Sequence, residues 1–526
     1  MPANKNESKN QGTEQKSRIE LERIVTGVPR LDYILKGGFI KGGTYTIMGP
    51  PGSGKTIFGN QICFNHIEDK KGHCVYITLL AESHGKMLTH LGTLNFFKPE
   101  VIPEYLFYMS GYRALKKDKL PGLLELIQKT IKERRASILI LDGIQAAAKH
   151  ADEKMDFEEF IHELQAYANI LQCTTLMLTP ANRVKTDDVE NVVVDGVIEM
   201  SYQLIGPRAV RELTVHKFRG TDFMVGKHET EITANGLQIH PRTEIQFDEP
   251  AEDAQEERIR MGFGIKKLDE MLQGGLMSGT TTVLLGSPGT GKTMLGLTFL
   301  VEGAKKKQKG IYFGFYEPPP RLIEKAERIG IPLRKYVDEG LIEIIWQPPL
   351  EHYMDALAER LLEKIKSDNH DKGRLFIDGV EGFRSAAIYQ DRIKRFLSAF
   401  CNQLRMSDVT TLITEELDLY KSEVELPTPE LATVTEGVIL VRYLELNSQI
   451  HRLISILKMR ESLYDTSIRE FEINDSGIQV SDSFKSAEAV LSGKGELLKG
   501  KASGGAKKSV GQKIREKLKP KRGGRK

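Results

Sequence analysis

The sequence predicts an α/β protein that carries the same domain twice. Each copy is expected to be a mostly parallel sheet flanked by helices, with an antiparallel hairpin at one edge. The first observation is an internal repeat, because residues 26–56 align without a gap to residues 263–293 and 14 of the 31 positions are identical. The second is the alternation of short apolar runs with amphipathic helical patterns, which is typical of a parallel sheet. A chain of 526 residues is also long enough for two large domains.

The elements follow in a regular order within each copy. Strands of the first copy are expected in TYTIM, CVYITLL, LFYM, SILILD and TTLML, and helices in PGLLELIQKTIKERR and FEEFIHELQAYANIL. Runs such as SILILD are apolar without alternation, which indicates strands that are covered on both faces. Each copy closes with a pair of runs typical of a hairpin, GVIEMSYQL with VRELTVHKF and GVILVRYLEL with RLISILKMR. We therefore expect antiparallel strands at one edge of each sheet.

Domain boundaries follow from composition. The stretch DEPAEDAQEER is rich in charge, contains a proline and holds no large apolar residue, so it separates the two copies. The expected organisation is a disordered N-terminus at 1–18, a first domain at 19–247, an acidic linker at 248–256, a second domain at 257–485 and a basic disordered tail at 486–526.

Charge is distributed unevenly along the chain. Residues 494–526 contain thirteen Lys or Arg and two Glu, so this segment has a net charge of +11. Because the whole chain has a net charge of +3, the remaining residues have a net charge of −8. A Gly-rich basic tail of this kind could touch nucleic acid or a membrane surface. It could equally act as a solubilising extension or dock on an acidic face of its own assembly.

Several classes of protein are disfavoured by the sequence. The polar N-terminus lacks the apolar core of a secretion signal, and no stretch approaches the roughly 20 apolar residues that span a bilayer. We therefore expect a cytoplasmic protein without a membrane span. The four cysteines, Cys63, Cys74, Cys173 and Cys401, form no CxxC pair. They are expected to be ordinary thiols rather than zinc ligands or disulfides.

Each repeat contains the pattern GxxxxGK[ST] between a strand and an amphipathic helix, as GPPGSGKT and as GSPGTGKT. Glycines let such a loop wrap so that backbone N–H groups face phosphates, while the helix dipole and the lysine add positive charge. The expected cofactor is ATP. The residues expected to bind it are Gly49, Gly52, Ser53, Gly54, Lys55 and Thr56 in the first copy, and Gly286, Gly289, Thr290, Gly291, Lys292 and Thr293 in the second.

A Mg²⁺ ion beside the phosphates needs oxygen ligands, and each copy supplies two. The P-loop threonines Thr56 and Thr293 are the first. Asp142 and Asp378, which end the buried strands ILILD and LFID, are the second. The alternative is that these aspartates only cap the turn before the glycine that follows each of them. Since both halves of the site occur twice, we expect two tandem RecA-like P-loop NTPase domains.

From about residue 20 to 485, the sequence resembles the KaiC family of circadian-clock ATPases and autokinases, which have two such domains. HKFRGTDF at 216–223 is similar to the family's KLRGTSH stretch, and LKMRESLYDTSIREFEINDSGIQV at 457–480 is similar to its KMRGS and AIREF stretches. The resemblance implies a homohexamer of two stacked rings with ATP between neighbouring subunits. It also implies a small KaiB-like protein as a partner.

The resemblance further implies four basic catalytic residues. Lys217 and Arg219 in the first copy, and Lys458 and Arg460 in the second, would reach the phosphates bound by the adjacent subunit. A cation supplied in trans can raise the rate of a P-loop enzyme by ~10³ to 10⁵. The alternative is a solvated edge strand, on which basic residues are common.

One departure from the family concerns the catalytic carboxylates. The family uses two adjacent glutamates, after the strand that follows the P-loop helix, to activate water or a protein hydroxyl. Here ITLLAESHGKM keeps only Glu82 and contains an insertion, while FGFYEPPPRL has Tyr316 and Glu317 in place of the pair. Glu82 and Glu317 are the expected bases, because a carboxylate there can orient the nucleophile. The alternative is that they are exposed residues at helix starts.

A second departure concerns autophosphorylation, which the family performs on adjacent Ser and Thr in its second domain. In the matching segment ELATVTEGVIL, Ala432 stands where the serine would be, Thr433 keeps the threonine position and Thr435 follows. Thr433 is therefore the candidate phosphosite of a serine/threonine autokinase. The missing serine argues against a full phosphorylation cycle.

Three functions compete at this point. The first is a hexameric Mg²⁺-dependent ATPase that acts as a signalling switch or clock-type timer, which two complete sites indicate. The second is a nucleic-acid-dependent ATPase of the RecA, RadA or DnaB type. The acidic body and the lack of RadA's four-cysteine module oppose it, and only the basic tail favours it. The third is a scaffold that binds ATP without turnover, which the loss of glutamates suggests.

Overall fold

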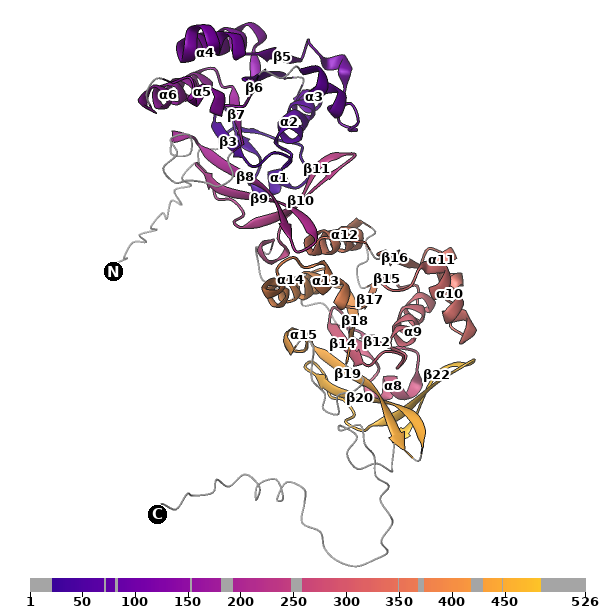
Figure 1. Cartoon of the computed structure of the whole chain (residues 1–526). Coiled ribbons are helices and arrows are strands. Elements are labelled where there is room, and N and C mark those ends of the chain that lie inside the picture. The colour runs from indigo at the N-terminus through magenta and orange to yellow at the C-terminus, as the bar shows by residue number, and fades with distance from the viewer. Residues whose placement is uncertain are drawn as a thin grey trace, which may run out of the picture. The chain divides into compact units, whose positions relative to one another are not determined.

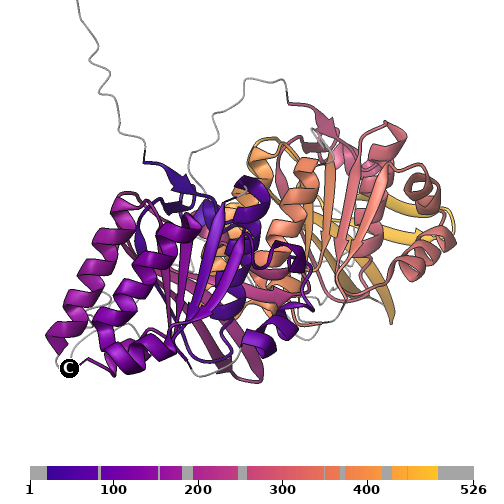
Figure 2. The same cartoon turned by 90° about the horizontal axis from the view of Figure 1, so that it is seen from above.

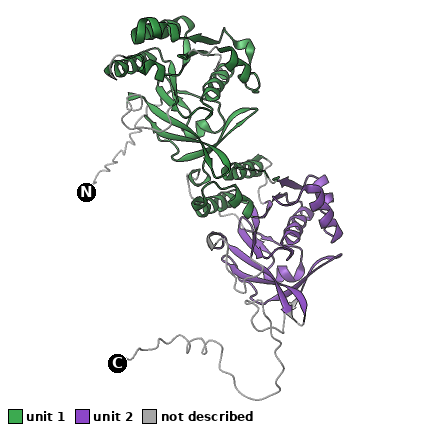
Figure 3. Ribbon diagram, in the orientation of Figure 1, with its two compact units in different colours: residues 1–257, 347–371, 380–409 green, residues 258–346, 372–379, 410–526 purple. Residues whose placement is uncertain are grey.

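The computed structural model describes residues 21–70, 72–80, 84–151, 154–180, 193–246, 258–348, 350–367, 373–417, 429–446 and 448–483. The expected disordered N-terminus at 1–18, the linker at 248–256 and the tail at 486–526 lie outside these residues. The chain forms two compact units (Figure 3). The first comprises residues 1–257, 347–371 and 380–409, and the second residues 258–346, 372–379 and 410–526.

The first unit is built on a nine-stranded sheet with the order β11-β10-β9-β8-β3-β7-β6-β4-β5 (Figure 1). Six of the strands run parallel, and β9, β10 and β11 continue the sheet as antiparallel hairpins. The strands are β3 (Thr44–Met48), β4 (His73–Thr78), β5 (Leu106–Ser110), β6 (Ala136–Asp142), β7 (Thr174–Thr179), β8 (Gly196–Ile205), β9 (Arg208–Phe218), β10 (Lys227–Thr233) and β11 (Gly236–His240). A separate two-stranded sheet pairs β1 (Arg23–Ile24) with β2 (Phe39–Ile40).

Helices cover both faces of this sheet. Tyr45 and Ile47 of β3 pack in one apolar core together with α2, and Met48 packs in a second core together with α4 and α6. In Figure 2, α4 and α6 lie together beside the strands of this sheet. Burial on both faces explains why the parallel strands are apolar without alternation. The helices encoded before the linker are α1 (Leu31–Ile34), α2 (Lys55–Lys70), α3 (His84–Leu91), α4 (Tyr112–Arg134), α5 (Gln145–Ala148) and α6 (Lys154–Ile170), with the 3-10 turns η1 (Pro99–Val101) and η2 (Thr243–Ile245).

The long helix α4 contains a kink. Lys119 has φ 54° and ψ −148°, which are not helical angles, and Pro121 follows two residues later. Proline has no N–H to donate and disfavours helical angles in the preceding backbone. The helix predicted from Pro121 onward is therefore the second part of a longer, interrupted helix.

The second unit repeats the topology in a nine-stranded sheet with the order β16-β15-β17-β18-β14-β19-β20-β21-β22. Its strands are β14 (Thr281–Gly286), β15 (Gly310–Gly314), β16 (Ile342–Trp346), β17 (Arg374–Asp378), β18 (Thr410–Glu416), β19 (Gly437–Leu446), β20 (Gln449–Met459), β21 (Arg469–Asn474) and β22 (Gly477–Ser483), and β12 (Arg260–Met261) pairs with β13 (Leu276–Met277). Its helices are α8 (Lys266–Met271), α9 (Lys292–Lys305), α10 (Pro319–Arg328), α11 (Leu333–Asp338) and α15 (Pro429–Val434). The predicted fold class, two tandem RecA-like domains with antiparallel edges, is confirmed.

Segments encoded after the linker complete the first unit. These are α12 (Met354–Ser367), α13 (Glu381–Ala386), the 3-10 turn η3 (Gln390–Arg392) and α14 (Ile393–Met406). They pack on η2 and β11. The sequence pattern did not reveal this grouping, because it follows from contacts between segments more than a hundred residues apart.

A buried charge cluster ties these helices to the first sheet. Arg392 donates to the Glu244 carboxylate at 2.7 and 2.9 Å and to Asp355 Oδ2 at 2.9 Å. The Glu229 carboxylate lies 3.8 Å from Arg392 Nη1 and accepts the backbone N–H of Asp355 at 3.1 Å. Burial raises the pKa of both Glu229 and Asp355, and the guanidinium opposes that rise. One arginine thus lies within 4 Å of three acidic groups that are largely removed from water.

The four cysteines are buried and free of disulfides. Burial raises the pKa of the Cys74 and Cys173 thiols, so they stay protonated at neutral pH. Within the described part of the chain, no helix has both the length and the hydrophobicity to cross a membrane.

Candidate nucleotide-binding sites

The first P-loop connects β3, which ends at Met48, to α2, which begins at Lys55. Gly54 has φ 102°, a left-handed conformation that glycine adopts without strain. At Gly49, an added Cβ would stand 2.1 Å from the carbonyl oxygen of Met200, so no larger residue fits. The loop is therefore a tight cradle whose backbone leads directly into a helix N-terminus, as phosphate binding requires.

The second P-loop has the same construction between β14 and α9. Gly291 has φ 101°, and a Cβ on Gly286 would stand 2.3 Å from the carbonyl oxygen of Val441. The structure thus builds two cradles of one design from the two copies of the repeat.

The two P-loop lysines occupy equivalent positions. Lys55 Nζ donates to the carbonyl oxygens of Gly49 at 2.7 Å and Pro50 at 2.9 Å, and Lys292 Nζ donates to Gly286 at 2.7 Å and Ser287 at 2.9 Å. Burial lowers the pKa of both ammonium groups, and nearby carboxylates counteract this shift. Each ammonium is held over its own loop, where a triphosphate would meet it.

The magnesium residues expected in the second copy lie together. Thr293 Oγ1 donates to Asp378 Oδ2 at 2.9 Å, so the two oxygen ligands are adjacent. Tyr312 OH donates to the same oxygen at 3.1 Å, and Thr414 Oγ1 donates to Asp378 Oδ1 at 3.0 Å. Burial raises the pKa of Asp378, while these three hydroxyl groups stabilise its charged form. Hard oxygen donors of this kind fit Mg²⁺.

In the first copy, too, a tyrosine hydroxyl binds the aspartate. Tyr76 OH donates to Asp142 Oδ2 at 2.6 Å, and the charge of Asp142 raises the pKa of Lys55 against the effect of burial. Thr56 lies next to Lys55 at the start of α2. The donor types again fit Mg²⁺. Among the described residues, no group of three or more His, Cys, Asp and Glu is placed to hold a metal.

The tyrosines that orient these aspartates were missed in the sequence. Tyr76 and Tyr312 lie at the same position of the two copies, since each occupies the strand after the P-loop helix. Each donates its hydroxyl to the aspartate on the neighbouring strand. An identical residue at equivalent positions of a duplicated sequence was the signal that could have revealed them.

The predicted catalytic carboxylates differ in what the structure shows of them. Glu82 lies outside the described residues. Glu317 forms an ion pair with Lys325, and its charge contributes to raising the pKa of Tyr312. Tyr316 is half exposed, and its ring lies close to Gly379. The second copy therefore has an aromatic side chain where the family has its first glutamate.

The four basic residues do not reach the P-loop of their own copy. In the first copy Lys217 pairs with Val197, and the backbone N–H of Arg219 donates to Asp195, just before β8 begins. Because β8 runs parallel to β3, this is the amino-terminal end of the strands, whereas the P-loop follows their carboxyl end. Lys217 and Arg219 thus lie at the amino-terminal end of the parallel strands, whereas Lys55 lies at their carboxyl end.

The second copy repeats this placement. Lys458 Nζ donates to the carbonyl oxygens of Ala432 and Thr435, each at 2.7 Å, and Arg460 Nη2 donates to that of Thr433 at 2.6 Å. The Thr433 side chain is exposed on α15. The basic pair and the candidate phosphosite therefore lie side by side, away from Lys292.

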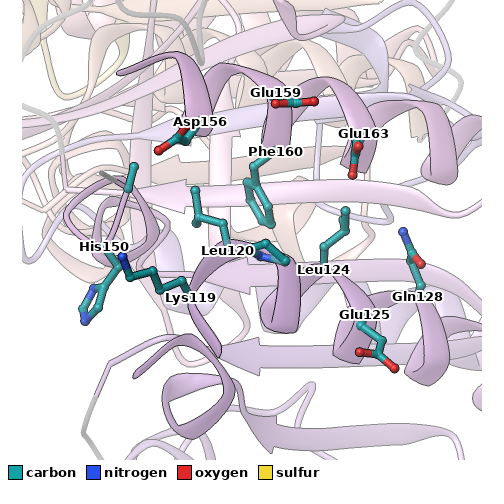
Figure 4. A pocket seen from close by; sticks show the side chains of 12 residues that line it. Lys119, Leu120, Leu124, Glu125, Gln128, His150, Asp156, Glu159, Phe160 and Glu163 are labelled. Atoms are coloured by element: carbon teal, nitrogen blue, oxygen red, sulfur yellow. The ribbon is translucent and has the colours of Figure 1, made fainter. Parts of the chain in front are cut away.

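The first unit also contains a cavity away from its P-loop. A cavity of about 570 Å³ lies between α4 and α6, lined by Leu120, Leu124 and Phe160 with Glu159 and Glu163 at its rim (Figure 4). No P-loop residue lines it. This cavity is therefore separate from the nucleotide sites, which the geometry of the P-loops indicates.

Comparison with known proteins gives one family over both copies. A family model described as "ATPase: KaiC" matches residues 24–244 and again residues 261–485. Circadian clock oscillator protein KaiC from Parathermosynechococcus lividus is 27% identical over 485 residues, covering 89% of this chain and 87% of that protein. Its counterpart in Rippkaea orientalis is 26% identical over 505 residues, covering 94% of each chain. The KaiC of Synechococcus elongatus is 25% identical over 499 residues, covering 92% of this chain and 93% of that protein.

Proposed function

The chain belongs to the KaiC family of ATPases, and from this premise we propose that it is a Mg²⁺-dependent ATPase that works as a homohexameric switch. The observation that carries the proposal is the repetition of one complete site. Each copy joins a P-loop cradle, a lysine held over it and an aspartate at the end of a strand that one other strand separates from the P-loop strand. One ATP binds at each P-loop.

The residues divide the work of hydrolysis. The loop amides and Lys55 or Lys292 bind the triphosphate and neutralise its charge. Thr56 with Asp142, and Thr293 with Asp378, would hold Mg²⁺, which when bound supplies further charge neutralisation at the phosphates. Glu82 is proposed to orient the attacking water in the first site, because a carboxylate at that place can accept its proton. Glu317, the base expected from the sequence in the second site, is ion-paired with Lys325.

The basic pairs act on the neighbouring subunit. Lys217 and Arg219 lie at the end of the parallel strands opposite to Lys55, and Lys458 and Arg460 are placed likewise in the second copy. This geometry supports a role in trans, since a ring can bring that end of the strands against the nucleotide of the next subunit. In a hexamer each ATP would therefore meet a cation from its neighbour.

The assembly is tested by size-resolved ATPase measurement. With Mg²⁺ and ATP, we expect a particle six times the 59.2 kDa chain that releases phosphate. Removing nucleotide, or chelating Mg²⁺ with EDTA, should dissociate the ring and stop turnover, because the ligand that bridges two subunits is lost. Light scattering coupled to size exclusion checks the first result, and phosphate release checks the second. A strictly monomeric but active enzyme would contradict the proposal, and a hexamer without turnover would favour an ATP-binding scaffold.

A second activity, serine/threonine autokinase, is favoured by Thr433. This side chain is exposed, and Arg460 binds its carbonyl oxygen, so the hydroxyl lies beside the residue proposed to reach the neighbour's phosphates. We expect label from γ-labelled ATP on the wild type and at least tenfold less on Thr433→Ala, with Thr435→Ala as the control, since Thr435 is buried and bonded to Leu431. Equal label on the wild type and Thr433→Ala would exclude Thr433 as the site.

The biological role proposed is a signalling or clock-type switch. The relatives named above are circadian clock oscillator proteins, and this chain resembles them over nearly the whole of both proteins. The expected location is the cytoplasm. The expected partners are further copies of the chain and a small KaiB-like protein.

A further inference from the structure

The second nucleotide site contains a carboxylate that no part of the proposal so far uses. Glu416 is the last residue of β18, which lies between β14 and β17 in the sheet. Glu416 is in register with Gly286, the first residue of the P-loop, and the next residue, Leu417, donates its N–H to the Gly286 carbonyl oxygen at 3.1 Å. Strand β18 therefore ends between the P-loop and Asp378.

The side chain of Glu416 points to the side where the phosphates would bind. Glu416 Oε1 lies 4.0 Å from Lys292 Nζ. The glutamate side chain is 51% exposed and the lysine side chain 7% exposed, so the carboxylate is on the open side of the ammonium. Thr414, two residues earlier and hence on the same face of the strand, donates to Asp378 Oδ1 at 3.0 Å. Glu416 thus lies on the same face of β18 as Thr414, whose hydroxyl binds the Asp378 carboxylate.

The first copy has no counterpart to this side chain. Thr179 is in register with Met48 on the P-loop strand, as Glu415 is with Leu285, so the residue equivalent to Glu416 is Pro180. A proline can neither accept a proton nor orient water. The second copy therefore has a carboxylate at this strand end that the first copy lacks.

We propose that Glu416 orients and deprotonates the attacking water in the second ATP site. The inference rests on the proposed ATPase function. The water oxygen forms a bond to the γ-phosphorus while the bond from that phosphorus to the bridging oxygen breaks, and the electron pair leaves with ADP. Glu416 accepts the proton of the water and returns it to solvent after phosphate has left. A carboxylate suits this task because it is charged and basic at neutral pH.

The test uses the full-length chain with the first site disabled by Lys55→Ala, so that the remaining turnover belongs to the second site. Adding Glu416→Gln is expected to lower kcat about 10²-fold, the lower end of what a general base contributes. ATP affinity should stay the same or improve, because the change removes a negative charge near the triphosphate. Glu472→Gln, an exposed glutamate on β21, is the matched control and should change nothing.

Each outcome decides the question. An unchanged kcat in Lys55→Ala/Glu416→Gln would overturn the role of Glu416 and leave the ATPase proposal intact. A raised KM with normal kcat would overturn it too, because Glu416 would then only position Lys292. If Lys55→Ala alone shows no turnover while it still binds ATP, the second site does not hydrolyse ATP, and that part of the proposed function fails together with the role of Glu416.

Discussion

Replacing both P-loop lysines, Lys55→Ala together with Lys292→Ala, is expected to lower ATP turnover about 10²- to 10³-fold at each site. This is the scale of losing one preorganised hydrogen-bond donor that stabilises charge in a transition state, about 10²- to 10³-fold. Each ammonium group is held beside its own P-loop by two carbonyl oxygens, where a bound phosphate would lie next to it. ATP affinity should fall as well, because the triphosphate loses its counter-charge. Isothermal titration with a non-hydrolysable analogue and steady-state phosphate release measure the two effects.

The single variants separate the sites. Lys55→Ala and Lys292→Ala should each remove one of two binding events per chain and leave the other. Circular dichroism checks that both proteins remain folded. Equal, background-level phosphate release from the wild type and all three variants would contradict catalysis and favour a scaffold that only binds ATP.

The second large effect concerns the cations supplied in trans. Arg219→Ala together with Arg460→Ala is expected to lower turnover by about 10³- to 10⁵-fold, the range known for such an arginine in P-loop enzymes. Binding of ATP should persist, because these residues lie away from the P-loop of their own copy. Arg328→Ala is a suitable control, because this arginine is exposed on α10 and pairs with its helix neighbour Glu324.

Mixing the two inactive proteins makes the test specific. The lysine variant keeps its arginines, and the arginine variant keeps its P-loops. In mixed rings some interfaces then combine an intact P-loop with an intact arginine of the neighbour, and turnover should return. If mixing restores nothing although mixed rings form, the arginines act within their own chain or not at all.

The fold and the phosphate cradles could be predicted from the sequence because both depend on local patterns. Apolar runs define the strands, and the GxxxxGK[ST] pattern requires its glycines at fixed places, as the φ of 101° at Gly291 illustrates. The same holds for the aspartates, which end apolar strands. Their roles, like those of the trans-acting residues, stay predictions.

Residues that act through sheet order could not be predicted in this way. Glu416 lies next to the P-loop only because β18 is inserted between β14 and β17, a pairing of strands more than a hundred residues apart. Tyr312 and Thr414 reach Asp378 for the same reason. Sequence spacing carries no information on such neighbours until the strand order is known.

The cluster around Arg392 shows that the segment which was duplicated and the segment which folds as one body are not the same. Glu229 and Glu244 are encoded before the linker, and Arg392, which lies within 4 Å of both, is encoded after it. A chain that ended at the linker would lack this guanidinium together with α12 and α14, which pack on η2 and β11. The first unit therefore needs residues from both sides of the linker to cover its acidic surface.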